Sequence, residues 1–436
     1  MSASSKGASR SIVVLGLDGT PYTFIKKELE AGTLPNLGSL FSRGILGRME
    51  TELPAVSSVA WASFMTGVNP GGHGIFGFTD RQPGVYELYF PNYSNLRAEP
   101  IWDRISREGG RCCVLNVPST YPARPLNGIL VSGFVAPSLE RAVYPAGAYE
   151  YLKGSGYRID VDAAKARQSL DRLLEDLHAT LEKRREAMLH FYEQENWDFF
   201  MCVFTGTDRL HHFLWGHYET GDRTYKPEFL RYYRRLDEII GEFVSLFPAE
   251  TDLCMLSDHG FCGIKKEVFL NPLLRQSGFV SFQGERPKTI ADINPSDTKA
   301  YCLDPGRIYL NLQGREPAGI VGSNEAESIL GQIGEILLGL KDPESGSEVI
   351  ERVERGKDIY FGPYAGAGPD LVAVPRPGYD LKGRMGDEVF SEVGILSGMH
   401  THDDAFVFVG AGSGAEAPAH IRGLAPLLLQ TWRGGS

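Results

Sequence analysis

Acidic and imidazole side chains follow several short apolar runs of this sequence, at the points where strands of a sheet would end. Three such runs, IVVLGL, FFMCVF and LCML, are followed within a few residues by the side chains Asp18, Asp208, His212, Asp258 and His259. Two further imidazoles, His400 and His402, stand in GMHTHDD, just before the run AFVFV. Ligands of open α/β sheets bind at the carboxyl ends of the strands. We therefore expect the first three groups to gather along one sheet edge.

This set of side chains indicates metal chemistry. Three carboxylates and at least three imidazoles suit Zn²⁺ or a similar divalent ion, and they are enough for two ions. Asp208 and His212 are four residues apart, so they share one face if the segment is helical. Asp258 and His259 are adjacent, and at a strand end two successive side chains point to opposite sides and could reach two different ions.

Each of these groups also has an ordinary structural explanation. An aspartate after a strand is often only a helix cap, and an Asp-His-Gly sequence can be a simple turn. The occurrence of four such groups at strand ends favours the metal site. His178, His190 and His217 lie on helix-like or polar stretches, where surface or structural roles are expected.

A second stretch, LPAVSSVAWASFMTGVNPGGHGIFGF, places two serines where a polar loop passes into a helix-like segment, Ala60 to Met65. The free N–H groups and the positive dipole end of a helix N-terminus form a ready phosphate site. A nearby metal ion would also lower the pKa of a serine hydroxyl and make it a nucleophile. The spacing alone leaves both Ser57 and Ser58 as candidates, beside the plainer reading as N-cap serines.

The elements that must position these residues alternate between buried strands and amphipathic helices. Strands are expected at 12–17, 112–117, 129–131, 199–204, 253–256 and 405–409, and helices at 20–31, 35–41, 170–192 and around 229–247. Buried strands alternating with helices predict an α/β fold with a mostly parallel central sheet and helices on both faces.

Residues 262–385 are less regular and richer in Gly and Pro, with a strand expected at 309–312 and a helix at 326–340. We interpret this stretch as an inserted cap subdomain that determines substrate specificity. The catalytic core is then expected at 11–261 and 386–425, with residues 1–10 as a disordered N-terminal tail. Lys265 and Lys266 either contact an anionic substrate or form part of the solvated surface.

The composition excludes several classes of protein. A net charge of -11 argues against binding a nucleic-acid duplex, which needs clustered Lys and Arg. No apolar run approaches the roughly 20 residues that span a bilayer, and the polar start, MSASSKGASR, is unlike a secretory signal. The six scattered cysteines form no CxxC pair. The chain is therefore expected to be cytoplasmic, with no indication of its oligomeric state.

Taken together, LGLDG, the Ser57 stretch, TGTDRLHHFLW, LSDHGF and GMH resemble the alkaline phosphatase superfamily. The similarity is greatest to its type I phosphodiesterase/nucleotide pyrophosphatase branch and to predicted phosphohydrolase/phosphomutase relatives. The resemblance covers about residues 11 to 410, and it rests on the order and chemistry of the motifs rather than on any one of them. It implies an alkaline-phosphatase-like fold.

The resemblance also implies roles for individual residues. Thr66-Gly67 selects Ser57 as nucleophile, the D-x-x-x-H spacing selects His212 over His211, and G-x-H selects His400, with His402 as a rival. His73 would shape the site floor, and Asn92, in FPNYSN, would contact phosphate. One metal would be held by Asp18, Ser57, Asp258 and His259, and the other by Asp208, His212 and His400.

The implied function is hydrolysis of phosphoric esters, of phosphodiesterase or nucleotide pyrophosphatase type, through a covalent phosphoserine. Two divalent ions, Zn foremost with Mn or Fe as alternatives, would assist it. The substrate would be a small phosphorylated molecule such as a nucleotide or nucleotide sugar. The alternatives are a phosphomonoesterase, a phosphomutase-type phosphotransferase and a metal-binding relative without catalysis. The segment of sequence between Ser57 and FFMCVF is short, which argues against the mutase.

Overall fold

The computed structural model describes residues 11–248, 250–284, 287–411 and 416–434. The expected N-terminal tail, residues 1–10, lies outside the described residues, as does the part of the expected core at 412–415. Within the described part of the chain, no helix combines the length and the apolar character needed to cross a membrane, and all six cysteines are free thiols.

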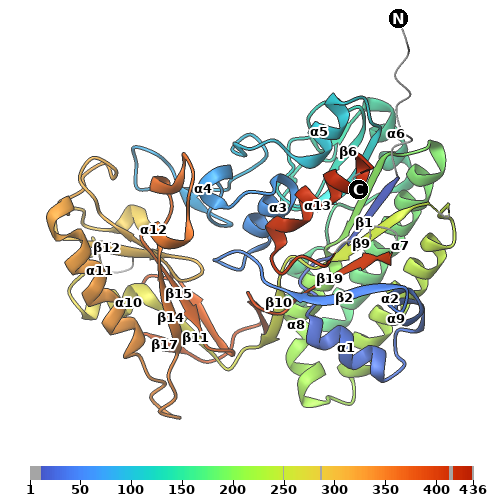
Figure 1. Ribbon diagram of the computed structural model, residues 1–436. Helices are drawn as coiled ribbons and strands as arrows, with labels where there is room; N and C mark the ends of the chain where they lie inside the picture. The colour runs from blue at the N-terminus through green and yellow to red at the C-terminus, as the bar shows by residue number, and fades with distance from the viewer. Residues whose placement is uncertain (1–10, 249, 285–286, 412–415, 435–436) are drawn as a thin grey trace, which may run out of the picture.

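A large central sheet positions the site (Figure 1). Eight strands of the described chain form it in the order β2-β19-β9-β1-β8-β5-β6-β7. The middle five, from β9 to β6, are mutually parallel, whereas β2, β19 and β7 run antiparallel to their neighbours. The bounds in chain order are β1 Ile12–Leu17, β2 Gly44–Met49, β5 Cys112–Val117, β6 Gly128–Ser132, β7 Val143–Tyr144, β8 Phe199–Phe204, β9 Asp252–Leu256 and β19 Ala405–Gly410.

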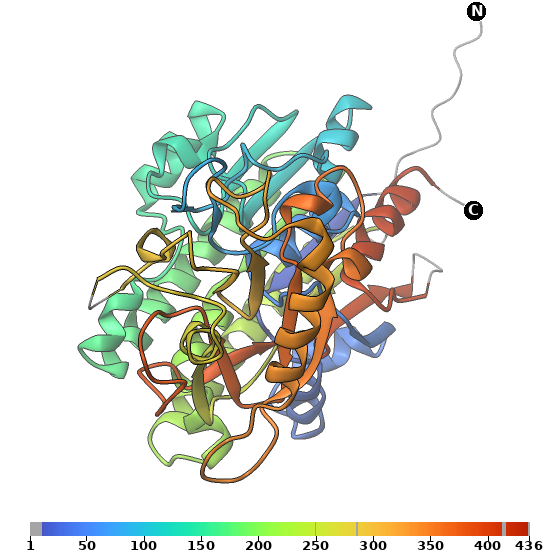
Figure 2. The same ribbon diagram turned by 90° about the vertical axis from the view of Figure 1, so that its left-hand side faces the viewer.

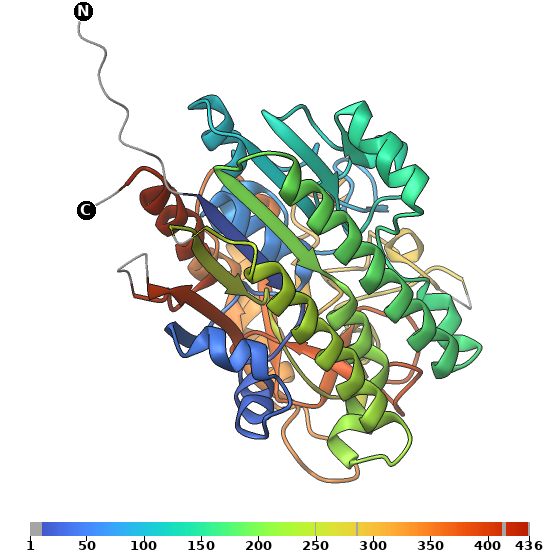
Figure 3. The same ribbon diagram turned by 90° about the vertical axis from the view of Figure 1, so that its right-hand side faces the viewer.

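Helices cover both faces of this sheet because its inner strands are apolar on both sides. In β1, Val13 and Leu15 pack into one core cluster, and Ile12 and Val14 pack into the other. Figure 3 shows the long helices of the first face lying across the strands. That face carries α1 Tyr22–Glu30, α2 Pro35–Phe41, α6 Ala146–Ser155, α7 Leu170–Gln194, α8 Gly206–Thr220 and α9 Tyr225–Val244. The other carries α3 Ser57–Thr66, α5 Ile101–Arg107 and α13 Leu424–Trp432.

The predicted α/β class, with a mostly parallel sheet between two helical layers, is confirmed. A second, smaller body lies to one side of the central sheet, and Figure 2 views it face on. It has a four-stranded sheet, β12-β13-β15-β14, a three-stranded sheet, β16-β11-β17, and its own core cluster. Its elements are β11 Lys266–Phe269, α10 Leu270–Gln276, β12 Ala300–Leu303, β13 Arg307–Leu310, α11 Ser323–Leu338, β14 Ile350–Arg355, α12 Gly356–Ile359, β15 Leu371–Pro375, β16 Tyr379–Lys382 and β17 Phe390–Ser391.

The limits expected for the inserted subdomain stay a prediction. Strand β17 lies beyond residue 385 and still pairs with β11. From the core side, the short helix α4 Pro70–His73 and the paired strands β3 Asp80–Arg81 and β4 Leu88–Tyr89 precede α5 in the chain. Tyr86, between those two strands, donates a hydrogen bond of 2.6 Å to Asn311 of the second body.

Between the two bodies lies a small antiparallel pair, β10 Gly260–Gly263 and β18 Gly398–Thr401 (Figure 1). Its register sets Phe261 opposite His400. Because β10 follows directly after β9, the pair holds His400 beside the carboxyl end of the central sheet. The two strands, GFCG and GMHT, are short and form no apolar run that a sequence pattern would reveal.

Candidate metal centre and active site

The candidate ligands meet at the carboxyl edge of the parallel strands, as the sequence predicts for the first three groups. Asp18 follows β1, and Asp208 lies in the first turn of α8, which follows β8. His212 is one turn further along α8, on the same face. The antiparallel strand β19 begins at this edge, so His400, shortly before it on β18, joins the group.

Three imidazoles are fixed in the same way by the backbone around them. In His212, His259 and His400, Nδ1 lies within hydrogen-bond distance of a carbonyl oxygen. A carbonyl only accepts, so Nδ1 carries the hydrogen and the lone pair of Nε2 is left free. This is how histidines that bind metals are commonly oriented. The accepting carbonyls belong to Gly398 at 3.1 Å, Gly260 at 3.0 Å and Ala55 at 3.0 Å, respectively.

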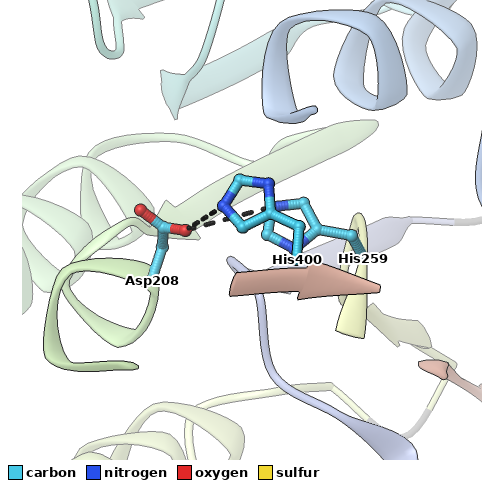
Figure 4. Close-up of side chains that lie close together, drawn as sticks. All are labelled: Asp208, His259 and His400. Carbon is cyan, nitrogen blue, oxygen red and sulfur yellow. Dashed lines mark ion pairs between the residues drawn. The ribbon is translucent and has the colours of Figure 1, made fainter. Parts of the chain in front are cut away.

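The free Nε2 atoms converge on one carboxylate oxygen, Oδ1 of Asp208. It lies 3.2 Å from Nε2 of His400, 3.4 Å from that of His212 and 3.9 Å from that of His259. Nε2 of His212 and Nε2 of His400 are only 3.0 Å apart. Figure 4 shows the rings of His259 and His400 lying face to face beside Asp208. Lone pairs aimed at one another repel, so this arrangement calls for a cation or a proton between them.

A second group adjoins the first and shares His259 with it. Asp18, Asp258 and His259 bring one ligand atom each within 4.8 Å of the others. Ser57 Oγ lies 3.3 Å from Oδ1 of Asp18 and 3.1 Å from Nε2 of His259. Oδ2 of Asp258 is 3.4 Å from Nε2 of His259. Asp258 and His259 thus meet in this group, because they lie in a bend after β9 and not on an extended strand. His259 also reaches the Asp208 group, and the expectation that the two residues serve different ions stays a prediction.

The electrostatics of the cluster fit a divalent cation. Burial raises the pKa of Asp258 to about 7, with the carboxylate of Asp208 adding to the shift, and burial lowers the pKa of the His259 imidazole to about 4. Burial, together with the neighbouring carboxylates, likewise raises the pKa of Asp18 well above its usual range. Among the described residues, Oδ1 of Asp208 and Oδ2 of Asp258 are buried without a hydrogen-bond partner. Neutral imidazoles beside unsatisfied carboxylates form a donor set for Zn, Mn or Fe.

Ser57 is the first residue of α3, and a tryptophan of this helix contacts the first strand. Trp61 Nε1 donates a 2.9 Å hydrogen bond to Oδ2 of Asp18. The Trp61 ring packs so closely on Gly16 that a Cβ there would lie 2.5 Å from it. His73, buried beneath α3, is 2.9 Å from Ser63 Oγ and accepts from the Ile75 N–H. Ser57, the candidate nucleophile, and Asp18 are thus held by one packed unit.

The rivals that the sequence left open lie outside the two ligand groups, although His402 lines the cavity above them. Ser58 lines a separate, smaller cavity, and its buried Oγ has no hydrogen-bond partner in the described chain. His211 lies within hydrogen-bond distance of the Gly19 carbonyl, stacks on Phe229 and has its pKa lowered to about 3 by burial. His402 Nε2 lies 2.9 Å from Nη2 of Arg352, which donates to it.

Two other sequence-based candidates do not reach the cluster. Asn92 lines the smaller cavity with Ser58, and its Oδ1 accepts a 2.9 Å hydrogen bond from the Ser94 N–H within a local turn. Lys266 is mostly buried in the second body, with Nζ 3.2 Å from Asp342 and 2.9 Å from Glu344. It forms internal ion pairs rather than solvated surface.

Arg209 is a feature of the site that the sequence reasoning missed. Its Nη1 lies 3.2 Å from Oδ2 of Asp208, and its Nη2 lies 2.8 Å from Oδ2 of Asp160. The guanidinium carbon lies 4.1 Å from the ring centre of Phe134. The signal was its place directly after Asp208 in TGTDRLHH, but only the tertiary structure brings Asp160 and Phe134 to it.

A cavity of about 350 Å³ opens over this cluster, between the central sheet and the second body. That volume is in the range of small-molecule sites. Asp18, Ser57, Asp208, His212 and His400 all line it. A ligand in the cavity would therefore contact the candidate nucleophile and members of both metal-ligand groups.

Several solved structures share the fold of this chain. Phosphonoacetate hydrolase from Sinorhizobium meliloti 1021, in complex with phosphonoformate, has a TM-score of 0.65 and 15% identity, covering 98% of this chain and 96% of its own. Murine ectonucleotide pyrophosphatase/phosphodiesterase 5 has a TM-score of 0.55 and 13% identity, covering 97% and 95%. Its inactive variant, solved with AMP, has a TM-score of 0.56 and 12% identity. No curated protein matches the sequence.

These similarities, at 15% identity or less, show that the chain shares the α/β fold of these proteins. At the level of sequence, the family model for type I phosphodiesterase/nucleotide pyrophosphatase matches residues 12–403. The chain belongs to this family of phosphoester hydrolases, and the resemblance inferred from its motifs is confirmed.

Proposed function

We propose that this chain hydrolyses phosphoric esters with the aid of two divalent cations, Zn foremost and Mn or Fe as alternatives, and with Ser57 as nucleophile. The observation that carries the proposal is the convergence of three unprotonated Nε2 atoms on buried carboxylates. The residues that would hold the cations are Asp18, Ser57, Asp258 and His259 for one, and Asp208, His212 and His400 for the other, with His259 close to both groups.

Bound cations would lower the pKa of the Ser57 hydroxyl and of a water molecule and would neutralise the phosphoryl oxygens. Ser57 Oγ, once deprotonated, forms a bond to phosphorus while the bond to the ester oxygen breaks. The departing alkoxide takes up a proton, and a phosphoserine remains. In the second step a water oxygen bonds to phosphorus, its proton is lost, and Ser57 Oγ leaves and regains a proton.

Two features of the chain would support the transferring group. Ser57 opens α3, and in its first turn the N–H groups of Ser57 and Ser58 are available to phosphoryl oxygens, whereas those of Val59 and Ala60 donate to the Val56 carbonyl. Arg209 keeps Oδ2 of Asp208 paired, which leaves Oδ1 directed toward the imidazoles. Asn92 lines a different, smaller cavity, so its contact with phosphate stays a prediction.

We further propose that residues 262–385 act as an inserted subdomain that supplies one wall of the cavity. The separate core cluster and sheets of this region support that division. The substrate is then a small phosphorylated molecule that fits between the two bodies. The relatives solved with phosphonoformate and with AMP support this class of ligand.

A paired assay tests the reaction type. Purified protein, with its metal content determined, would be given bis-p-nitrophenyl phosphate and p-nitrophenyl phosphate before and after chelation. We expect faster release from the diester and loss of release on chelation. Preference for the monoester would favour a phosphatase, and transfer to added alcohols without net hydrolysis would favour a phosphotransferase. No release from a sample without metal would contradict the proposal.

Ser57→Ala tests the nucleophile. Because the alanine variant lacks the attacking oxygen, we expect kcat for the diester to fall at least about a thousandfold, while bound metal is retained through the other ligands. Ser58→Ala, the matched control, should keep activity. Residual turnover of Ser57→Ala within roughly tenfold of wild type, about 1.4 kcal/mol of barrier, would exclude Ser57 as nucleophile.

A further inference from the structure

The walls of the cavity differ sharply from its floor. The floor holds the carboxylates and imidazoles of the metal-ligand groups, whereas hydrocarbon side chains from both bodies form most of the walls. The central body and its loops contribute Leu53, Pro54, Val56, Phe78, Phe134 and Met399. The second body contributes Pro305, Val372, Val374, Pro375, Pro377 and Leu381.

The cations of the walls are already paired. Among the described residues that line the cavity, the Lys and Arg side chains are Lys382 and Arg209. Lys382 Nζ lies 2.6 Å from Oδ2 of Asp380, and Arg209 is bound by Asp160 and Asp208. The walls carry further carboxylates, Asp304, Glu351 and Asp403. A second phosphate or carboxylate on the substrate would therefore meet acidic groups and no uncommitted cation.

The aromatic rings of the wall are also engaged with one another. The rings of Phe78 and Phe134 stack with centroids 5.4 Å apart and 7° between their planes. The Arg209 guanidinium covers the Phe134 ring, and Phe90 packs edge-on against Phe78. These rings form a fixed apolar wall in which a planar base would have to displace an existing stack.

From these observations we infer that the substrate is a phosphoester with an alkyl chain as its second ester group and with no anionic group besides the reacting phosphate. The inference rests on the proposed function, because it describes the remainder of a substrate whose phosphoryl group lies at Ser57. Apolar walls favour such a group by removing hydrocarbon from water.

A matched series of diesters tests this. Each carries one p-nitrophenyl leaving group, and the second ester group is methyl, hexyl, 5′-thymidyl or 2-phosphoethyl. We expect kcat/KM to rise up to about fourfold per methylene from methyl toward hexyl, until the group fills the cavity. The hexyl ester should exceed the thymidyl ester and should exceed the 2-phosphoethyl ester at least tenfold. Equal values for methyl and hexyl, or preference for the thymidyl or phosphoethyl ester, would overturn the inference.

A binding measurement separates failure of the inference from failure of the proposed function. Calorimetric titration of the metal-loaded protein with methyl-, butyl- and hexylphosphonate needs no turnover. Affinity that rises with chain length supports the hydrocarbon site even if no ester is hydrolysed, in which case only the proposed function fails. Hydrolysis with equal affinity for the three phosphonates would overturn the inference alone.

Two variants of the cavity wall test which residues select the second ester group. For both variants, the measured quantity is the ratio of kcat/KM between two esters. Val374→Ala should reduce the hexyl-to-methyl ratio of kcat/KM several-fold, because it removes hydrocarbon from the wall. Pro377→Lys, at an exposed position of the rim, should raise the phosphoethyl-to-hexyl ratio about tenfold by adding a free cation. Pro343→Lys, at an exposed turn outside the cavity, is the control and should change neither ratio. Unchanged ratios in both wall variants would contradict the assignment.

Discussion

Arg209 illustrates how a residue beside a candidate metal ligand can determine which of its oxygens faces the metal site. It is held between Asp160 and Asp208 and lies over Phe134, so its guanidinium has one position. With Oδ2 of Asp208 paired in this way, Oδ1 remains the atom that meets His212 and His400. We interpret Arg209 as a positioning residue for Asp208.

Arg209→Met tests this role. Removing the guanidinium frees Asp208 to turn, so we expect metal affinity and kcat to fall about 10- to 100-fold, as is usual when a partner of a metal ligand is lost. Competitive metal titration gives the affinity and steady-state kinetics gives kcat. Arg185→Met, which removes a partner of Glu242 on the surface, is the matched control. Unchanged metal affinity in Arg209→Met would assign Arg209 a purely structural role.

The buried carboxyl group of Glu52 is expected to make the stability of the protein depend on pH. Burial raises its pKa to about 7, although Arg422, 3.1 Å away, and the Ser63 hydroxyl oppose the shift; the buried phenol of Tyr360 is another neighbour. The folded state thus holds this proton more tightly than the unfolded state, and stability is lost as pH rises from about 4.5 through 7. The upper limit at pH 8 is about 3 kcal/mol.

In Glu52→Gln this loss should disappear, because glutamine does not titrate. Denaturant unfolding at pH 5 and pH 8 would show a smaller difference in unfolding free energy than in wild type. Glu50→Gln, at an exposed neighbouring position, should leave the difference unchanged. An equal pH dependence in Glu52→Gln and wild type would show that Glu52 ionises normally.

At the scale of elements, the contact between α3 and β1 positions Ser57, the proposed nucleophile. The Trp61 ring fills the space over Gly16 and donates to Asp18, so strand, helix and ligand form one unit. Gly16→Ala would place a Cβ 2.5 Å from Trp61 Cη2 and 3.0 Å from a methyl of Val203. Overpacking of this kind typically costs about 1–3 kcal/mol.

We expect Gly16→Ala to lower both the unfolding free energy by about that amount and kcat, because relief of the clash moves α3 away from Asp18. Gly147→Ala, in α6 where a Cβ meets nothing within 4 Å, is the control and should be neutral or slightly stabilising. Thermal or denaturant unfolding and diester kinetics on both variants give the answer. If Gly16→Ala is destabilised but keeps the wild-type kcat, the contact between Gly16 and Trp61 contributes to stability and does not position Ser57.

The elements that could be predicted from sequence are those with strong local patterns. β1, β5, β8 and α2 have the predicted bounds, since apolar runs and a proline-initiated helix define them. The strand expected at 309–312 is found at Arg307–Leu310. β10 and β18 could not be predicted, because their sequences, GFCG and GMHT, form no apolar run and are specified by their partner across the sheet. The position of His400 depends on that pair.

At the scale of the molecule, the cavity exists only because the two bodies meet. Arg307, fully buried in the second body, donates from Nη2 to the Thr79 carbonyl of the first at 2.7 Å. Gly77 makes room for it, since a Cβ there would lie 2.3 Å from the guanidinium carbon. Sequence patterns could predict an inserted region, but not which of its side chains line the cavity, because that depends on this packing.

Metal removal is expected to affect the stability of the whole molecule. The candidate ligands extend from Asp18 to His400 and come from the ends of three central strands and from β18. Ions that bind only the folded chain stabilise it, by about 4 kcal/mol for one ion at a free concentration a thousand times its Kd. Chelation should therefore lower the melting temperature, and readdition of Zn or Mn should restore it.

His400→Ala should lose part of this metal-dependent shift, because Nε2 of His400 lies among the ligand atoms of the Asp208 group. His402→Ala is the matched control, since its Nε2 accepts from Arg352 and it should keep the full shift. Calorimetric melting of both variants with and without chelator distinguishes them. If His400→Ala keeps the full metal-dependent shift in melting temperature and His402→Ala loses part of it, the roles of these two histidines are exchanged. If the wild-type protein shows no such shift, bound metal does not connect these strands.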